Sequence, residues 1–279
     1  MKSIVEGTPY VSKRFQNDTS TNLLLKLFVT RNQFQFLITD STNTILYLHP
    51  FELNGEQASF FQPEITKEIT TAIENLNKEF SSVSVGIFTP DFTLVPNVIK
   101  AEMVEGFFRQ HLLNNSESTS EILYDHINEI NGSLIFSAGK ELMQSLQEKF
   151  PMFAYQHSCS AQIRNLSPRN QALNVYAIIQ SKWIQVICLS GHQLKFANAF
   201  PFKTAEDFIY YVIAVYRLLD LNPENVPLIL FGEVIRDSTV YQAAVKYVRH
   251  VKLGKASSVW KFEDDYPFPL HFYSTLLSL

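Results

Sequence analysis

Few residues in this sequence have the type and spacing that catalysis needs, and a histidine–cysteine pair comes first among them. His157 and Cys159 are two positions apart, so on a strand their side chains would point to the same side. A thiolate beside an imidazole can act as a nucleophile activated by a general base. The alternative interpretation, a packed thiol at the edge of a strand, is the one we favour.

Two further histidines and an acidic run are the candidates for binding a ligand or a cation. His49 and His192 fall in or beside predicted turns without an acidic partner at ligand spacing, which favours surface or turn histidines. Glu263, Asp264 and Asp265 are consecutive, so their side chains diverge and a solvated loop is the better interpretation. The sequence therefore predicts no catalytic residue and no metal site.

A basic cluster near the end of the sequence has features of nucleic-acid binding. Its members are Lys246, Arg249, His250, Lys252 and Lys255, with Trp260 and Lys261 beyond them. Positive charge next to an aromatic ring could follow phosphates and stack a base. Lysines also protect exposed sheet edges from pairing, and the net charge of −4 is too small for a long phosphate-binding surface. We therefore favour a solvated edge and expect no nucleic-acid partner.

Length and composition describe the protein that carries these residues. The 279 residues suffice for about two domains. Charged residues make up 18%, against about 25% in an ordinary soluble domain, and 23 phenylalanines indicate a core rich in aromatic rings. This composition excludes intrinsic disorder and a coiled coil.

The sequence predicts neither a secretory signal nor a membrane span. The opening residues lack the apolar run of a signal peptide. The longest apolar stretch, residues 208–216, has nine residues, far fewer than the roughly 20 that span a bilayer. Cys159 and Cys188 lie in strand-like segments without C-x-x-C spacing, so we expect two free buried thiols in a reducing cytoplasm.

Two stretches of short alternating runs predict the same arrangement of strands. Residues 23–51 and residues 173–202 each read as a three-stranded antiparallel meander. The two superpose without a gap at an offset of 149 residues, so that Phe34 meets Trp183 and Ile38 meets Ile187. This match indicates an internal duplication.

Each meander is followed by an amphipathic helix, a buried strand and a second helix. In the first half these are residues 63–80, 82–88 and 97–113, and in the second half residues 204–219, 226–232 and 238–248. Thr204 and Asp207 have the spacing of a capping box. The apolar stripe behind them comprises Phe208, Tyr211, Val212, Val215, Leu218 and Leu219.

This order, occurring twice, predicts an α/β protein made of two duplicated ribonuclease-H-like lobes. Each lobe would be a mixed sheet, with an antiparallel meander extended by parallel strands and covered by helices. We expect residues 1–150 to form the N-terminal lobe and residues 151–279 the C-terminal lobe. Two such lobes face each other across a cleft in actin, the sugar kinases and the heat-shock chaperones. The gapless match covers only about thirty residues, so two unrelated α/β domains remain the alternative.

Three segments carry a resemblance to a known family. Residues 92–96 (FTLVP), 198–221 (from NAFPF to LLDL) and 228–235 (LILFGEVI) resemble an uncharacterised bacterial family, domain of unknown function 3822. The resemblance extends over most of the chain from residue 23. It implies an actin-like ATPase fold, similar in shape to the pilus-assembly and cell-division members of that superfamily, without an established activity.

The phosphate-binding motifs of that superfamily are missing. An actin-like ATPase needs Asp-x-Gly in its first hairpin turn and a Gly-Gly pair at the adenosine, and this sequence contains neither. The P-loop, the GxGxxG loop and the common hydrolase motifs are missing too. The residues that remain as weak candidates for binding a nucleotide in the cleft are Arg31, Asn32, Ser181, Lys182, Gly232 and Glu233.

The missing motifs favour a function without catalysis. We expect a cytoplasmic actin-like pseudo-ATPase that serves protein interaction or assembly, with a protein partner and no cofactor; ATP is not supported by motifs. A homo-oligomer is left open. The alternative is a divergent ATPase or phosphotransferase in which Arg31, Lys182 or Glu233 replaces the missing groups, although neither Arg nor Lys can bind the divalent metal.

Overall fold

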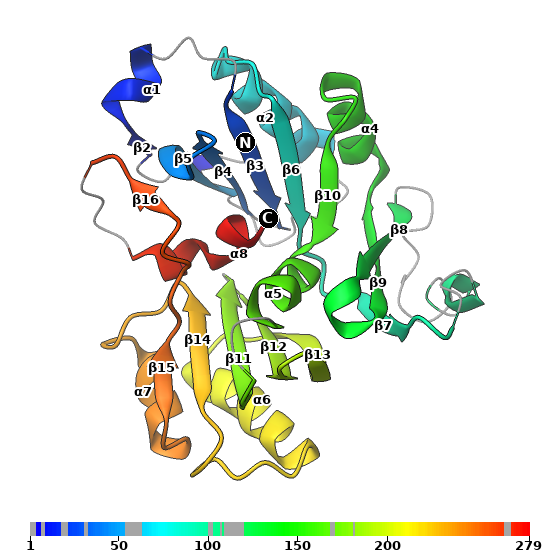
Figure 1. Ribbon diagram of the computed structural model, residues 1–279, viewed down its shortest axis with the longest axis vertical. Coiled ribbons are helices and arrows are strands. Elements are labelled where there is room, and N and C mark those ends of the chain that lie inside the picture. Colours follow the sequence, from blue (N-terminus) through cyan, green and yellow to red (C-terminus); the bar gives the residue numbers. More distant parts are fainter. Residues whose placement is uncertain are drawn as a thin grey trace.

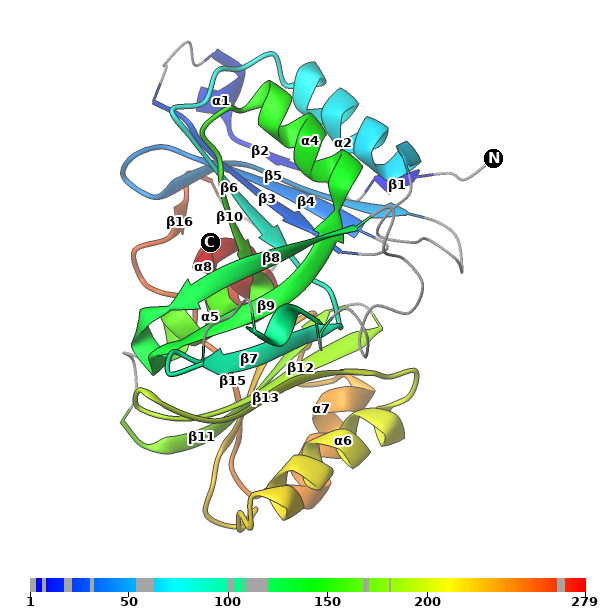
Figure 2. The same ribbon diagram turned by 90° about the vertical axis from the view of Figure 1, so that its right-hand side faces the viewer.

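The computed structural model describes two lobes, each built around a mixed sheet, with a smaller sheet beside them (Figures 1 and 2). It describes residues 4–6, 9–17, 22–30, 33–53, 63–99, 103–106, 108, 120–167, 171–180, 182–264 and 269–279. Within these ranges, no helix has the length and apolar character needed to cross a membrane.

The first sheet contains the first predicted meander. Its main path runs β1-β5-β4-β3-β6-β10, and β2 and β16 also pair with β5. The bounds are β1 (Ile4–Glu6), β2 (Tyr10–Val11), β3 (Leu24–Val29), β4 (Gln33–Thr39), β5 (Thr44–Leu53), β6 (Ser82–Ile87), β10 (Ala154–His157) and β16 (Lys261–Phe262). Strands β3, β4 and β5 are antiparallel, whereas β6 and β10 extend the sheet in parallel.

The second sheet repeats this arrangement. Its order is β13-β12-β11-β14-β15, with β11 (Leu173–Gln180), β12 (Trp183–Ser190), β13 (Gln193–Pro201), β14 (Leu228–Gly232) and β15 (Val251–Leu253). The meander is antiparallel, and β14 and β15 add to it in parallel. Strands β3 and β11 begin at the offset that superposes the two sequences, as do β5 and β13. The predicted class, mixed sheets with a meander and parallel strands, is confirmed.

Helices cover the outer face of each large sheet. In the first lobe these are α2 (Pro63–Asn75) and α4 (Lys140–Lys149); in the second they are α6 (Ala205–Leu218) and α7 (Thr239–Tyr247) (Figure 2). Helix α6 begins where the sequence predicts, because the Thr204 side chain accepts from the Asp207 N–H and the Asp207 carboxylate accepts from the Thr204 N–H. The shorter helices are α1 (Lys13–Asn17), η1 (Asn128–Ile130), α5 (Ser158–Leu166), η3 (Leu270–Tyr273) and α8 (Ser274–Ser278).

A third sheet was not predicted. It has the order β7-β9-β8, all antiparallel, with β7 (Phe92–Pro96), β8 (Ser120–Ile127) and β9 (Gly132–Gly139). The helix predicted over residues 97–113 is wrong at its start, because residues 97–99 form a turn after β7; residues 103–106 and 108 are helical, and the rest lies outside the described ranges. Strand β7 pairs with a strand far along the chain, so its neighbourhood in the sequence carries no sign of the sheet.

Sheet membership does not follow a division at residue 150. Strand β10 follows that position yet pairs with β6 of the first sheet, and β16 near the end of the sequence pairs with β5. Parallel pairing explains this, because a parallel neighbour needs a long crossover, here the third sheet and α4. The two expected domains, 1–150 and 151–279, stay a prediction, as does the duplication.

Candidate functional site

The space between the two large sheets is occupied by the chain itself. Helix α8 contacts α5, β3 and β14, so it touches both lobes (Figure 1). Leu276 is fully buried and Leu277 nearly so, in a cluster that includes Phe28 and Phe88 of the first lobe. The side chain of Leu279 covers Gly86 so closely that a Cβ there would lie 2.5 Å from it. Apolar side chains of α8 therefore pack into the inter-lobe cleft.

The cavity that remains in this cleft is too small for a nucleotide. It has a volume of about 10 Å³ and is lined by Phe28 and Gln33 of the first lobe, Gln180 and Gly232 of the second, and Leu276 of α8, among others. A cavity of about 10–15 Å³ accommodates one water molecule, whereas ligand pockets measure roughly 300–1,000 Å³. The cavity that these described residues enclose has no room for ATP.

The predicted nucleotide-binding residues surround this closed region only in part. Arg31, Asn32 and Ser181 lie outside the described residues. Lys182 is exposed in the turn between β11 and β12, and Glu233 is exposed directly after β14, at the rim of the small cavity. These assignments stay predictions.

Gly232 has a structural reason to be glycine. Its φ of +85° lies in the left-handed region, and a Cβ would lie 1.9 Å from the Ile179 carbonyl oxygen of β11. Ile179 is its partner in the parallel β11–β14 ladder. The absence of a side chain therefore allows β11 and β14 to approach each other. This packing explains the glycine without a bound phosphate.

Neutral polar groups line the contact between α8 and the lobes. The Gln180 Nε2 donates to Thr275 Oγ1 over 2.7 Å, and the Gln162 Nε2 donates to the same oxygen over 3.2 Å. Nearby, the Gln185 Nε2 donates to Ser158 Oγ over 2.6 Å. All five residues are buried. Carboxamides and hydroxyls carry no charge to offset a triphosphate, and no set of three His, Cys, Asp or Glu in the described part of the chain could hold a metal ion.

The histidine–cysteine pair is a neutral structural element. The predicted strand position of Cys159 is wrong, because this residue lies in α5. His157 ends β10 and caps that helix: its Nδ1 accepts from the Cys159 N–H over 3.2 Å. The His157 Nε2 lies 3.0 Å from the Thr89 carbonyl oxygen. Burial lowers the pKa of His157 to about 3, and burial together with Asp125 raises the pKa of Cys159. The thiol of Cys159 is packed, as the favoured interpretation has it, but in a helix and not at the edge of a strand. Cys188 is likewise free and buried, on β12.

The other polar candidates are dispersed. His49 is not a turn or surface residue, because β5 continues through it and buries it, with Nδ1 2.7 Å from the Tyr47 hydroxyl. His192 lies exposed in the β12–β13 turn, as predicted. Glu263 and Asp264 are exposed, and both backbone N–H groups donate to the Tyr10 hydroxyl; Asp265 lies outside the described ranges.

The basic cluster extends over elements of both lobes. Lys246 belongs to α7, whereas Lys252 lies on the edge strand β15. Arg249 pairs with Glu224 over 3.3 Å. Lys261 belongs to β16 in the first sheet. Dispersal over two lobes is consistent with solvated edges.

Lys26 is a buried cation in the region between the two lobes. It lies on β3, two residues before Phe28, is 9% exposed, and places Nζ 4.2 Å from the centroid of the Trp260 ring. Among the described residues it forms no ion pair. Burial lowers the pKa of Lys26 to about 8.

Lys26→Met is expected to raise the free energy of unfolding by about 1–2 kcal/mol at pH 7, because it removes a buried charge and keeps an apolar chain of similar length. The folded pKa of about 8 lies below the ordinary 10.5, so between these values the unfolded chain binds more protons. Wild-type stability therefore rises from pH 8 to 10.5, and the advantage of the variant should vanish above that pH. Urea denaturation at pH 7 and at pH 10.5 measures this, with the exposed Lys67→Met as control. An advantage equal at both pH values would contradict the charge argument.

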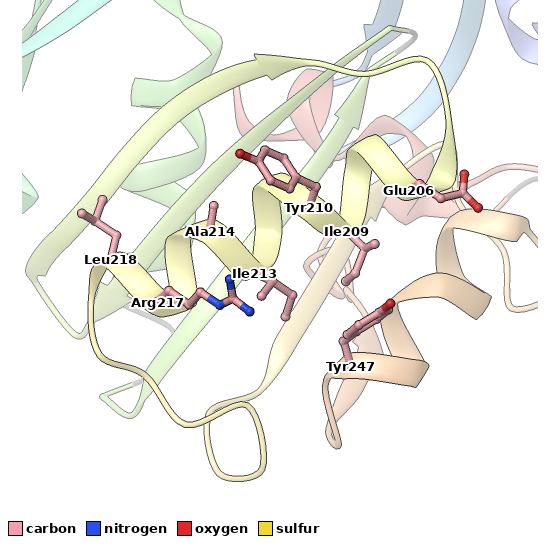
Figure 3. Close-up of a pocket in the computed structure, with 8 residues that line it drawn as sticks. All are labelled: Glu206, Ile209, Tyr210, Ile213, Ala214, Arg217, Leu218 and Tyr247. Atoms are coloured by element: carbon pink, nitrogen blue, oxygen red, sulfur yellow. The ribbon is translucent and has the colours of Figure 1, made fainter.

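The described surface also carries an open apolar groove on the outer side of the second lobe. It has a volume of about 660 Å³ and lies between α6 and α7 (Figure 3). Its lining residues are Glu206, Ile209, Tyr210, Ile213, Ala214, Arg217 and Leu218 from α6, with Tyr247 from α7. Tyr210, Leu218 and Tyr247 are 68%, 69% and 58% exposed.

Helix α6 is apolar on two faces. Phe208, Val212 and Val215 pack against the sheet, while Tyr210 and Leu218 face outward. Leu218 was predicted as part of the core stripe and this is wrong, because its position on the helix lies away from the buried face. A helix that is apolar nearly all round is typical of one covered on both sides. In the sequence, the apolar run of residues 208–216 indicates this second apolar face, but we assigned the run only to the core.

Comparisons with known proteins show the family and the fold. A family model described as "Protein of unknown function (DUF3822)" matches residues 12–251. No curated protein matches the chain. A Bacteroides thetaiotaomicron protein with actin-like ATPase fold and unknown function is similar over 94% of this chain and 97% of its own, with 20% identity and a TM-score of 0.75.

Two further solved structures share the architecture at lower identity. The PilM-PilN type IV pilus biogenesis complex has 9% identity and a TM-score of 0.57, covering 88% of this chain and 91% of that one. The ethanolamine utilization protein EutJ from Carboxydothermus hydrogenoformans has 7% identity and a TM-score of 0.50, covering 92% and 88%. The predicted actin-like ATPase fold is confirmed.

Proposed function

The chain belongs to the family described as "Protein of unknown function (DUF3822)", and we propose that it is a non-catalytic actin-like protein that serves protein interaction or assembly. The closed cleft carries this proposal: α8 leaves a cavity of about 10 Å³ where an actin-like ATPase would need a nucleotide pocket. A pseudo-ATPase keeps the two lobes as a scaffold and presents other surfaces to partners.

Several observations support the proposal. The polar groups described at α8 are neutral glutamines and hydroxyls, and Gly232, which lines the cavity, is explained by strand packing. An open apolar groove lies outside the cleft, between α6 and α7. A solved structure of similar fold is described as the PilM-PilN type IV pilus biogenesis complex. Two buried free thiols favour the cytoplasm as the compartment.

Nucleotide titration tests this function. We expect no heat on titrating ATP with Mg²⁺ up to about 1 mM, a concentration at which a Kd of that order would be detected, and no phosphate release above a heat-treated sample. Saturable binding would overturn the proposal and favour the divergent nucleotide-binding enzyme. In that case Arg31→Ala and Lys182→Ala should weaken binding, and the exposed Lys67→Ala on α2 should not.

A further inference from the structure

Four residues on the outer face of α6 form a narrow stripe with opposite charges at its ends. Glu206, Tyr210, Ile213 and Arg217 follow each other at intervals of four, three and four residues, which keeps them on one side of the helix. Figure 3 shows Glu206 and Arg217 toward the two ends of α6 with the apolar side chains between them. We name these four residues the α6 stripe.

The two charged side chains of the α6 stripe have no partner among the residues that the structure describes. In the described part of the chain neither Glu206 nor Arg217 forms an ion pair or a side-chain hydrogen bond. Tyr210 is 68% exposed at the centre of the stripe. Tyrosine and arginine are the residue types that dominate binding energy at protein interfaces. The stripe therefore has the composition of an interface without a partner in this chain.

The spacing of the stripe is symmetric. Read in the opposite direction, the intervals are again four, three and four, so two antiparallel copies of α6 would place each Glu206 opposite an Arg217. The same register places each Tyr210 opposite an Ile213. A two-fold axis through the middle of the helix generates both pairings at once, as an isologous interface requires.

From this self-complementarity we infer that the α6 stripe is a homodimer interface, at which α6 of a second copy of this chain packs antiparallel to the first. Helix α6 has 14 residues, which makes it about 21 Å long, enough for two turns of apolar contact between the charged ends. Tyr247 of α7 also lines the groove and would enlarge the contact toward the size of a stable interface.

Charge favours a second copy over an unrelated helix. A partner of other sequence would need a cation and an anion at the same separation, whereas a second copy supplies both by symmetry. Two ion pairs then flank an apolar centre, the arrangement of a polar rim around a desolvated core. The inference deepens the proposed function, because it names the assembly partner. Only the biological role of the dimer, and not the dimer itself, rests on the proposed function.

Sedimentation equilibrium of the full chain tests the interface through a charge exchange. We expect the wild type to dimerise in the micromolar range. Arg217→Glu alone and Glu206→Arg alone should each weaken dimerisation by at least about tenfold, since each variant replaces two attractive pairs by two repulsive ones. The double variant Glu206→Arg/Arg217→Glu should recover most of the wild-type affinity.

Matched controls separate the interface from general charge effects. Lys67→Glu and Glu68→Arg make the same charge changes on exposed positions of α2 in the other lobe, and both should leave dimerisation unchanged. Glu206 and Arg217 lie near opposite ends of α6, where charge reversal opposes the helix dipole. If either reversal unfolds the protein, Glu206→Gln and Arg217→Gln replace it, with an expected loss of about threefold each.

Three outcomes would overturn the inference. The first is a wild type that stays monomeric at about 100 μM, which would leave the groove to another protein. The second is a dimer that single reversals do not weaken. The third is a pair of single reversals that weaken the dimer without recovery in the double variant. None of these results changes the nucleotide titration, so the failure of the interface and the failure of the proposed function are distinguishable.

Discussion

Gly232→Ala is expected to lower the free energy of unfolding by at least about 3 kcal/mol, and the variant is expected to accumulate as unfolded or aggregated protein at 37 °C. The methyl group would meet the Ile179 carbonyl oxygen at 1.9 Å, and the residue would have to keep a φ of +85°. A left-handed non-glycine residue costs about 1–2 kcal/mol, and overpacking typically costs a further 1–3 kcal/mol. Neither cost is relieved by rotation of a side chain, because the obstacle is backbone in the β11–β14 ladder.

Urea denaturation of Gly232→Ala against Gly106→Ala measures this effect. Gly106 is helical and exposed, and a Cβ there meets nothing within 4 Å, so the control should keep or slightly raise wild-type stability. A Gly232→Ala protein as stable as the wild type would show that strand packing does not require the glycine. That result would favour a role of Gly232 in letting the backbone approach a phosphate.

Leu276→Ala is expected to lower the free energy of unfolding by about 2–5 kcal/mol, the range for truncating a fully buried leucine. Leu276 is 0% exposed and packs in the cluster that joins α8 to both lobes. The loss should appear in urea denaturation as a lower midpoint. Met152→Ala, at a side chain that is 93% exposed, is the control and should change stability by less than about 0.5 kcal/mol.

The same variant probes whether the closed cleft hides a nucleotide site. Enlarging the small cavity at Leu276 should not produce ATP binding, because the groups around it are neutral and no phosphate-binding loop is present among the described residues. A neutral effect on stability would contradict the role of α8 as the element that closes the cleft. Gain of ATP binding would instead favour the divergent nucleotide-binding enzyme.

The two large sheets could be predicted because their information is local. Alternating runs mark each strand of a meander, and short turns fix which strands are neighbours. The capping box at Thr204 marks the start of α6 for the same reason. In the third sheet only the β7–β9 pairing is hidden in this way, because it crosses a long insertion. Strands β8 and β9 are neighbours in the chain and pair with each other, so that part of the sheet was local and was missed.

The candidate site was harder to predict than the fold. Missing motifs drew attention to the cleft, but nothing in the sequence of residues 270–279 indicates that they fill it, because that depends on contacts with strands far earlier in the chain. Buried glutamines such as Gln162 and Gln180 are ordinary surface residues by type, so composition does not reveal their hydrogen bonds to Thr275. The outer face of α6 was visible in the sequence, but a second apolar face is easily assigned to the core.

The return of the last segment to the first sheet has a consequence for the order of folding. Strand β16 pairs with β5, and Leu279 covers Gly86 of β6, so the first lobe reaches its final form only after the second lobe has been synthesised. Contacts between residues so far apart in the sequence form only after the entropy of a long loop has been lost, and they therefore slow folding. During translation the apolar side chains on the inner face of β3 and β6 stay exposed until the last segment has been synthesised. We therefore expect the nascent chain to bind a chaperone.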